Sequence, residues 1–504
     1  MTASDARLAG RRPPRPDTPR QAVPAPRLAE HRMSRVDTAW LRMDNDVNLM
    51  MIVGIWLLTP AITLGVLRER ISTRLLQYER FRHKAVPDAM GAAWVEDADF
   101  DVARHVLAQP LPLAPGQTER AALQALCADL AATALDPAHP LWQFHLVEHY
   151  EGGCALIARI HHCIGDGIAL ISVMNSITDG GDAPPRRRPS QAPHEAHDGD
   201  WLSDAVIKPL TDLAVRALDR SGSGVARTLN MLAGPKHTLQ GSLDMARTGL
   251  QVAGDLAALA LMGDDSPTRL KGKPSGRKVV AWGEPMPLEV VKVVGRALNC
   301  SINDVLLSCV SGAIGGWLRA QGDDPTGAEI RAMVPVNLRP LEQAWKLGNR
   351  FGLAPLVLPI GIANPVQRVY AVRARMAQLK GSFQPLLAFG VLAATGLFIK
   401  PVQDLVLGLF SKKTTAVMTN VPGPKVPLKF CGATLRQTMF WVPASGDVGV
   451  GVSILSYGGG VQFGLITDAA LCPDPQAIID RFEPEFQQLL LLALMLPWGG
   501  SDST

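Results

Sequence analysis

Apolar side chains recur along the chain in two regions where helical and strand patterns alternate. Over residues 33–179, spacings of three and four between apolar positions predict helices, and short continuous apolar runs predict buried strands. Ser34 and Asp37 indicate a helix start, because their side-chain oxygens can accept hydrogen bonds from the free amides of a first turn. The expected helices cover residues 62–78, 119–135 and 168–176, and the expected strands cover residues 48–58, 94–97, 142–148 and 155–160.

A second region with the same alternation begins near residue 279. Asn364 is expected to cap a helix whose first residue is Pro365, a position that tolerates proline. Because helices and strands alternate in both regions, the sequence predicts two α/β domains. The expected helices here cover residues 288–298, 302–318, 365–379 and 475–494, and the expected strands cover residues 279–282, 330–336, 353–359, 415–421, 438–442, 448–455 and 461–467.

A segment without apolar periodicity separates the two regions. Residues 180–200 are rich in Pro, Arg, Gly, His and Asp, which is typical of a linker, and residues 201–262 return to a helical pattern. The sequence therefore predicts four parts. They are an arm at residues 1–32, a first domain at 33–180, a linker with connecting helices at 181–275 and a second domain at 276–497.

The composition is apolar but globular. Of the 504 residues, 47% are hydrophobic and 19% are charged, and the net charge is +4. A chain of this length exceeds one ordinary hydrophobic core, which again favours two domains. The small net charge and the lack of zinc-finger, RNA-recognition and helix-turn-helix patterns argue against a nucleic-acid partner.

The first 32 residues and the longest apolar runs are the parts of the sequence that bear on membrane contact. The first 32 residues hold seven Arg and six Pro but no apolar segment, so they do not resemble a secretory signal. They are expected to form a disordered arm that is either inert or in contact with anionic lipid. No run reaches the roughly 18–20 apolar residues that span a bilayer. The nearest runs, at residues 386–399 and 486–496, favour buried or interfacial helices, so peripheral membrane contact stays open.

The cysteines indicate a reducing compartment. All seven are scattered along the chain, and none forms a CxxC pair. This spacing argues against a disulfide framework and against a cysteine metal site. The sequence therefore favours the cytosol.

One motif combines residues that can carry chemistry. The run His161-His162-Cys163-Ile164-Gly165-Asp166-Gly167 follows the strand expected at residues 155–160 and precedes the helix expected at 168–176. Such a junction can project a side chain into a cleft while its backbone stays fixed. An imidazole with an ordinary pKa of about 6.5 is mostly neutral in the cytosol, so His162 can take a proton from an attacking hydroxyl. The pattern predicts a general base for acyl transfer.

Other interpretations of this run are weaker. Neighbouring residues on a strand point to opposite faces, so two adjacent histidines rarely bind one metal ion, and a purely structural pair is the other alternative. No GxSxG elbow is present to supply a serine nucleophile. Asp166 can either orient the histidine or hold the loop through its backbone or an arginine. Gly167 is expected to adopt a backbone conformation that other residues avoid.

These residues resemble the wax ester synthase/acyl-CoA:diacylglycerol acyltransferase family of bacteria. The HHxxxDG run alone marks the wider group of CoA-dependent acyltransferases, which includes chloramphenicol acetyltransferase and the condensation domains of peptide synthetases. Five further blocks narrow the resemblance, although Thr419 stands where many relatives carry serine. They are Pro140-Leu141-Trp142, Asn303-Asp304, residues 335–339, Gly348-Asn349 and residues 419–424. The resemblance extends over residues 33–494.

The resemblance implies a fold and a set of site residues. The fold would be two chloramphenicol-acetyltransferase-like α/β sandwich domains with a tunnel at their interface, and His162 would act as base on that tunnel. His161 and Asp166 would have supporting catalytic roles. Further support is expected from Gly167, Asn303 and Asp304, and the candidates for the substrate pocket are Pro140, Leu141, Trp142 and Asn420.

The residues themselves leave simpler roles open. The Pro140-Leu141-Trp142 block can pack as a core edge in front of a strand. Asn303 stands at the start of a helix, where it can be a cap or can contact the histidine or an oxyanion. Asn420 is a weaker oxyanion candidate. The basic residues of the segment 269–278 can meet CoA phosphates or belong to a solvated linker.

The implied reaction moves a long acyl chain from acyl-CoA to a fatty alcohol or a diacylglycerol. The products would be a wax ester or a triacylglycerol and free CoA, and no metal or cofactor is expected. Acyl-CoA and the lipid acceptor would be the partners of a cytoplasmic protein peripherally associated with the inner membrane or with lipid droplets. The alternatives are a condensation or polyketide-esterifying acyltransferase and a lipid-binding relative without activity.

Overall fold

The computed structural model describes residues 31–88, 91–181, 262–339, 346–380, 384, 387–388 and 412–496. The arm expected at residues 1–32 lies almost wholly outside these residues. Of the linker and connecting helices expected at residues 181–275, residues 182–261 are also outside them, as is nearly all of the apolar run 386–399.

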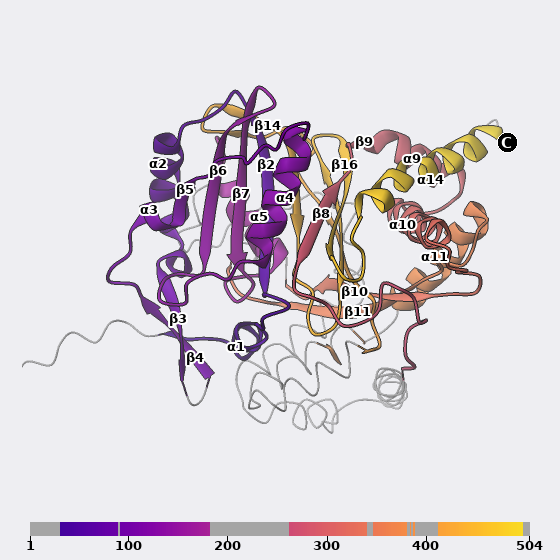
Figure 1. Cartoon of the computed structure of the whole chain (residues 1–504), viewed down its shortest axis with the longest axis horizontal. Coiled ribbons are helices and arrows are strands. Elements are labelled where there is room, and N and C mark those ends of the chain that lie inside the picture. The colour runs from indigo at the N-terminus through magenta and orange to yellow at the C-terminus, as the bar shows by residue number, and fades with distance from the viewer. Residues whose placement is uncertain are drawn as a thin grey trace, which may run out of the picture.

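The described chain forms two α/β lobes side by side, as the alternation of helical and strand patterns predicts (Figure 1). The first lobe is built on a six-stranded sheet with the order β13-β14-β2-β7-β6-β5. Its strands are β2 (Met51–Thr59), β5 (Val106–Ala108), β6 (Trp142–Tyr150), β7 (Gly153–His161), β13 (Lys429–Phe430) and β14 (Ala433–Trp441).

Two strands of this sheet come from the far end of the chain. β14 runs antiparallel to β2 and pairs Trp441 with Val53, and β13 pairs with β14 at the sheet edge. The apolar run at residues 438–442 predicts a strand at this place but carries no information on its partner. The two lobes are therefore joined by a shared sheet as well as by the chain between them.

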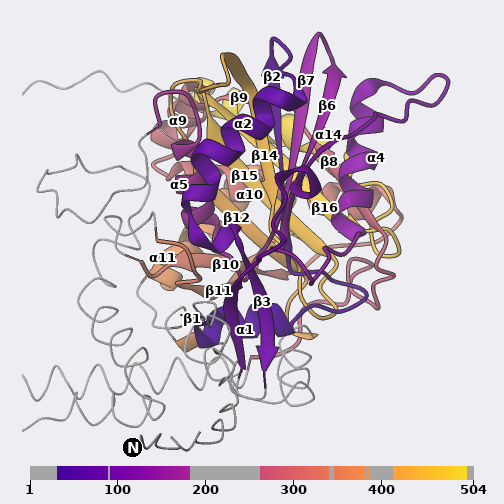
Figure 2. The ribbon, with the colours of Figure 1, turned by 90° about the vertical axis from the view of Figure 1, so that its left-hand side faces the viewer.

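The two faces of the first sheet are covered by different helices. Successive strand residues point to opposite faces, so Ile52, Gly54 and Trp56 of β2 share one face, while Val53 and Ile55 share the other. Val53 and Ile55 pack in a core with the helix α4 (Glu119–Ala132). Helix α5 (Gly167–Ser176) lies on the opposite side of the sheet from α4 (Figure 2).

The second lobe holds a larger sheet with one face covered by helices. Its order is β11-β10-β12-β15-β16-β8, with β9 beside β16, and β12 runs parallel to both β10 and β15. The strands are β8 (Lys278–Trp282), β9 (Met286–Pro287), β10 (Ile330–Asn337), β11 (Phe351–Leu358), β12 (Ala416–Pro422), β15 (Val450–Tyr457) and β16 (Gly460–Asp468). The helices are α9 (Leu288–Ala297), α10 (Ile302–Ala320), α11 (Pro365–Lys380) and α14 (Gln476–Met495).

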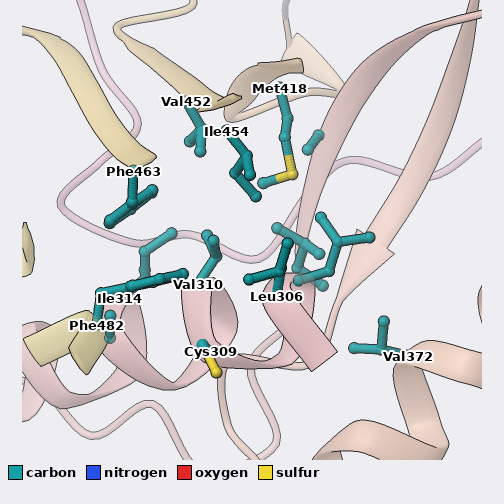
Figure 3. Close-up of a cluster of buried hydrophobic side chains, with 14 of the residues drawn as sticks. Leu306, Cys309, Val310, Ile314, Val372, Met418, Val452, Ile454, Phe463 and Phe482 are labelled. Atoms are coloured by element: carbon teal, nitrogen blue, oxygen red, sulfur yellow. The ribbon is translucent and has the colours of Figure 1, made fainter. Parts of the chain in front are cut away.

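Helix α10 forms the centre of the second core. Its Leu306, Val310 and Ile314 lie on one face at spacings of four residues and point toward side chains of the sheet (Figure 3). Val452 and Phe463 meet them from strands β15 and β16. Burial of this apolar surface holds the sheet and its helical layer together.

A small third sheet with the order β1-β4-β3 lies below the first lobe in Figure 1. Ser34 caps helix α1 as the sequence predicts, because its Oγ accepts from the Asp37 amide at 3.1 Å. Asn364 likewise accepts from the amides of Val366 and Gln367 at the start of α11. The remaining elements are β1 (His31–Arg32), α1 (Arg35–Arg42), α2 (Leu64–Arg74), η1 (Leu75–Gln77), η2 (Glu79–Phe81), β3 (His83–Asp88), β4 (Gly91–Glu96) and α3 (Val102–His105).

Among the described residues, no single helix is long and apolar enough to cross a membrane. Helices α9 and α10, which meet at 97°, reach the length and composition only when taken together.

Replacing Trp441 with alanine is expected to destabilise the protein by about 3–5 kcal/mol, because truncating a buried aromatic side chain removes apolar burial and leaves a cavity. Trp441 is 1% exposed, and its ring centre lies 5.8 Å from that of Trp282 on β8 of the other sheet. Chemical denaturation measures the loss. Val426→Ala, at a side chain that is 73% exposed, is the control and should change the free energy of unfolding by less than about 0.5 kcal/mol. Equal effects of the two substitutions would contradict a core in which Trp441 of the first sheet packs near Trp282 of the second.

Candidate active site

The HHxxxDG run forms the turn between β7 and α5. β7 ends at His161, and α5 begins at Gly167, within a residue of the expected positions. The His162 amide donates to the Met50 carbonyl at 2.7 Å, and Arg80 Nη1 donates to the Ile164 carbonyl at 2.8 Å. Gly165 forms a β-bridge with Gly348 of the second half of the chain. The backbone of the turn is therefore held from several directions.

His162 is buried at the junction of the two lobes, with 4% of its surface exposed. The Trp40 ring lies almost parallel to the imidazole, with the ring centres 4.1 Å apart and the planes at 9°. The centre of the Phe351 ring lies 5.5 Å from the centre of the imidazole. These contacts hold the plane of the imidazole in place.

A hydrogen bond to the side-chain oxygen of Asn349 sets which imidazole nitrogen carries the proton. Asn349 Nδ2 donates to Asp37 Oδ1 and to the His162 carbonyl, both at 2.8 Å. The Asn349 oxygen must then face His162, whose Nδ1 lies 2.8 Å from it. A carbonyl oxygen only accepts, so Nδ1 carries the proton and Nε2 keeps a free lone pair.

The environment keeps this ring neutral. Burial lowers the pKa of His162 to about 4, since the charged form loses its hydration inside the protein. Among the described residues, none forms a hydrogen bond with Nε2. The ring therefore offers an unprotonated nitrogen that can accept a proton.

His161 lies on the other side of the turn. Its Nδ1 accepts from the Cys163 amide at 3.1 Å, and its Nε2 lies 3.3 Å from Asp44 Oδ2. The two histidines have separate sets of contacts, as expected for neighbours on a strand. Within the residues that the structure describes, no cluster of His, Cys, Asp and Glu side chains is arranged to hold a metal ion.

Asp166 contacts an arginine and the loop backbone, and no contact joins it to His162. Its Oδ1 accepts from the Ala169 amide at the start of α5, and its Oδ2 lies 2.9 Å from Arg339 Nη2. The Arg350 amide also donates to Oδ2 at 2.9 Å. Since Arg339 and Arg350 belong to the second half of the chain, Asp166 connects the histidine turn to the other lobe.

The structure corrects the expectation for Gly167. Its φ does not lie in the left-handed region, and a Cβ added there would meet no atom within 4 Å. The positive φ at this place belongs to Gly348, at 117°. Gly167 instead lines a pocket, where the missing side chain leaves room.

An apolar pocket lies beside the histidine turn. It lies between one face of the first sheet and helix α5, which contributes Gly167, Leu170 and Met174 at helical spacing. Ile160 and Gly167, on either side of the HHxxxDG turn, both line it. The pocket encloses about 840 Å³ not filled by protein atoms, part of it open to solvent. Its other lining residues are Ile52, Gly54, Trp56, Leu156, Ala158, Ile171, Asn175, Gly423, Pro424, Leu428, Leu435, Thr438, Met439, Phe440, Leu455 and Tyr457.

The Pro140-Leu141-Trp142 block packs in the core and does not line this pocket. Trp142 is fully buried, and its indole donates to the Phe81 carbonyl at 2.9 Å. The Leu141 carbonyl accepts from the His161 amide at 2.9 Å. The block therefore supports the strand that carries the histidines, in agreement with the core-edge interpretation.

The candidates on α10 and β12 contact one another. Asn303 does not cap α10, because Ser301 is the cap and forms a capping box with Asp304. Asn420 Nδ2 donates to Asn303 Oδ1 at 2.8 Å, which ties the helix to strand β12. No contact joins either asparagine to His162.

The basic segment 269–278 is engaged mostly with protein groups. Arg269 pairs with Asp323 at 2.6 Å, and Lys278 donates to Asn48 at 2.6 Å. Lys271 lies 3.9 Å from Asp265. These contacts favour a structural role for the segment.

The sequence did not predict a site role for four side chains around His162. Trp40 of α1 and Asn349 contact the imidazole, Asp37 of α1 contacts Asn349, and Arg80 of η2 contacts Asp37. One signal was available. Asp37 lies on the apolar face of α1 with Trp40, and a carboxylate on a buried face needs a partner.

Two family models match the chain. The wax ester synthase/diacylglycerol acyltransferase catalytic domain matches residues 33–306, and the WS/DGAT C-terminal domain matches residues 347–490. The chain belongs to the wax ester synthase/diacylglycerol acyltransferase (WS/DGAT) family. It is therefore a member of a family of acyltransferase enzymes.

Relatives agree with this assignment. A protein of Mycobacterium tuberculosis named as a probable diacylglycerol O-acyltransferase is 27% identical over 434 residues, which cover 84% of this chain and 86% of the relative. The solved wax ester synthase/diacylglycerol acyltransferase of Marinobacter aquaeolei has a TM-score of 0.61 at 19% identity and covers 92% of this chain and all of its own. A condensation domain of the calcium-dependent antibiotic synthetase has a TM-score of 0.54 at 14% identity, covering 93% and 97%. The structural matches confirm the two-lobed fold of the WS/DGAT protein.

Breaking the buried pair of Asp166 and Arg339 is expected to destabilise the WS/DGAT protein by about 3–5 kcal/mol, because either substitution removes the opposite charge from a group buried inside the protein. Asp166→Asn and Arg339→Met should each show this loss in denaturant titrations. The double variant should lose less than the sum, with a coupling of about 1–3 kcal/mol.

The exposed pair of Lys292 and Glu289 provides the control. Lys292→Met should change the unfolding free energy by less than about 1 kcal/mol, since exposed ion pairs contribute little. Strict additivity of Asp166→Asn and Arg339→Met would show that the pair does not connect the lobes.

Proposed function

We propose that this WS/DGAT protein transfers a long acyl chain from acyl-CoA to the hydroxyl group of a fatty alcohol or a diacylglycerol. The observation that supports it is the unprotonated Nε2 of His162 on a turn whose two flanking residues, Ile160 and Gly167, line an apolar pocket. The products are a wax ester or a triacylglycerol and free CoA. The relative in M. tuberculosis is named for acyl transfer to diacylglycerol, and the one in M. aquaeolei is named for wax ester synthesis as well.

In the proposed reaction, His162 acts as general base and then as general acid. Nε2 takes the proton of the acceptor hydroxyl while that oxygen attacks the carbonyl carbon of the thioester. The carbonyl π electrons move to its oxygen and form a tetrahedral intermediate. When they return, the carbon–sulfur bond breaks, and the imidazolium gives its proton to the leaving thiolate. The steps leave an ester, free CoA and a neutral imidazole.

The apolar pocket is the proposed site of an acyl chain. Its lining is almost wholly aliphatic and aromatic, and removing a long chain from water into such a site contributes about 0.8 kcal/mol per methylene. Because Ile160 and Gly167 line the pocket on either side of the histidine turn, a chain bound there can present its reacting end near His162. No metal or cofactor takes part in these steps.

The protein is proposed to meet its substrates at a lipid surface, on the cytoplasmic side. The end of helix α14 exposes large apolar side chains, with Leu491 61% exposed, Leu494 56% and Met495 81%. Contiguous exposed apolar residues are typical of contact with a membrane or another protein. This location agrees with acceptors that are themselves membrane lipids.

His162→Ala is expected to lower the rate of thiol release from palmitoyl-CoA by about 10²–10⁴-fold with either hexadecanol or diolein. The reason is that no base then takes the proton of the acceptor hydroxyl. The exposed His149 is the matched control, and His149→Ala should keep the native rate. Circular dichroism of both variants tests whether they are folded.

A folded His162→Ala protein as fast as the native one would exclude the histidine mechanism. If the native protein forms no ester with either acceptor but accepts acyl groups from a carrier protein, a condensation-type reaction replaces the proposal.

Ala158→Phe is expected to shift the acyl preference toward shorter chains, since Ala158 lines the pocket from β7 and a larger ring occupies space there. The ratio of kcat/KM for palmitoyl-CoA to that for octanoyl-CoA should fall about tenfold or more, the effect of 1.4 kcal/mol. Ala108→Phe, at an exposed position on β5, should leave the ratio unchanged. An unchanged ratio in Ala158→Phe would place the acyl chain elsewhere.

A further inference from the structure

We propose that Asn349, Asp37 and Arg80 form a positioning chain that fixes the proton of His162 on Nδ1 and places an uncharged group, in place of a carboxylate, beside the ring. This inference rests on the proposed function, since it assigns how the proposed base is held ready. Nothing in the family match or in the names of the relatives assigns a role to these three side chains.

The first step is the direction of the hydrogen bonds. Asp37 Oδ1 accepts from both the backbone amide and Nδ2 of Asn349, at 3.0 and 2.8 Å. A carboxylate has no proton to donate, so the side-chain amide of Asn349 cannot flip without placing two oxygens against each other. Asp37 thus fixes Asn349, and Asn349 fixes the proton of His162.

The second step is the charge. An acidic side chain beside an imidazole stabilises its protonated form and raises its pKa. Here the group beside the ring is a neutral amide, and the carboxylate of Asp37 lies one residue further away. Arg80 Nη2 lies 3.1 Å from Asp37 Oδ2, so a positive charge balances the carboxylate. The chain therefore orients the imidazole through an uncharged group, which favours a second proton on the ring less than a carboxylate would, and burial keeps the ring neutral.

Other charged and titratable groups near His162 lie on the same turn or face it from neighbouring elements. His161 and Cys163 flank it on the same turn, and burial and the nearness of His161 both disfavour a positive charge on His162. Asp44 faces His161, and the Asp166–Arg339 pair lies further along the turn with no contact to His162. Trp40 and Phe351 pack against the ring from α1 and β11 and carry no charge.

The consequence concerns the pH at which the base works. A general base must be unprotonated, so its activity is lost as pH falls through its pKa. With an amide partner, kcat/KM should stay on its plateau from neutral pH down to about pH 5, since the pKa of His162 is about 4. A carboxylate in the place of the amide should move this acid limb to higher pH.

The test exchanges the two groups. In the double variant Asn349→Asp with Asp37→Asn, a carboxylate accepts from His162 Nδ1 and an amide donates to that carboxylate. The charge moves next to the ring, and the exchange also removes the donor to the His162 carbonyl and the acceptor for the Asn349 backbone amide, so the fold of the double variant is checked by thermal unfolding. The acid limb of kcat/KM is expected to rise by about 1–3 pH units, the effect of an adjacent opposite charge. The single variant Asn349→Asp sets two carboxylates against each other and should be less active than the double variant.

Asn349→Leu tests positioning alone. It removes the acceptor from Nδ1, so kcat is expected to fall by about 10²–10⁴-fold with little change in KM, the size of effect seen when a catalytic histidine is held in the wrong tautomer. Spectra of ¹⁵N-histidine-labelled protein, assigned by comparison with His162→Ala, should show protonated Nδ1 in the native protein and mixed tautomers in this variant.

These outcomes separate the two proposals. An acid limb that does not move in the double variant, or a native spectrum with the proton on Nε2, would overturn the positioning chain while leaving His162 as the base. Full activity of His162→Ala would overturn the proposed function, whereas the spectra would still report on the hydrogen bonds. Thermal unfolding of each variant tests whether it keeps its fold.

Discussion

Burial of polar groups where the two lobes meet is the constraint on which the site depends. A charge or amide taken out of water must find partners inside the protein, and at this junction the partners come from the opposite half of the chain. Asp37 meets Asn349, Asp166 meets Arg339, and the histidine turn meets Gly348. The geometry around His162 and the docking of the lobes are therefore set by the same contacts.

The sequence predicts most elements of the fold because their signals are local. Apolar periodicity places β2, α4, β7 and α10 within a few residues, and Ser34 and Asn364 mark the helix starts that the structure contains. The partner of β14 could not be predicted, since strand pairing across hundreds of residues leaves no local pattern. The edge hairpin strand β3 was missed because its sequence, with Pro87 and Asp88, lacks a clear apolar run.

The site was predictable to the extent that it is contained in one motif. His162 could be singled out from the sequence, but the groups that contact its ring, Trp40, Asn349 and Phe351, come from α1 and from the segment where β11 begins. Their convergence is a property of the folded chain. The expected strain at Gly167 was misplaced for a related reason, because the loop that needs a positive φ belongs to the facing segment at Gly348.

The pairing of β14 with β2 also constrains how the chain folds during its synthesis. β2 leaves the ribosome long before its neighbour β14, because most of the chain, between residues 59 and 433, separates them. During synthesis, one edge of β2 lacks its final partner until β14 has emerged, and exposed strand edges are prone to pair with other chains. Nascent chains of this enzyme therefore pass through a long interval in which protection of that edge by a chaperone would favour correct folding over aggregation.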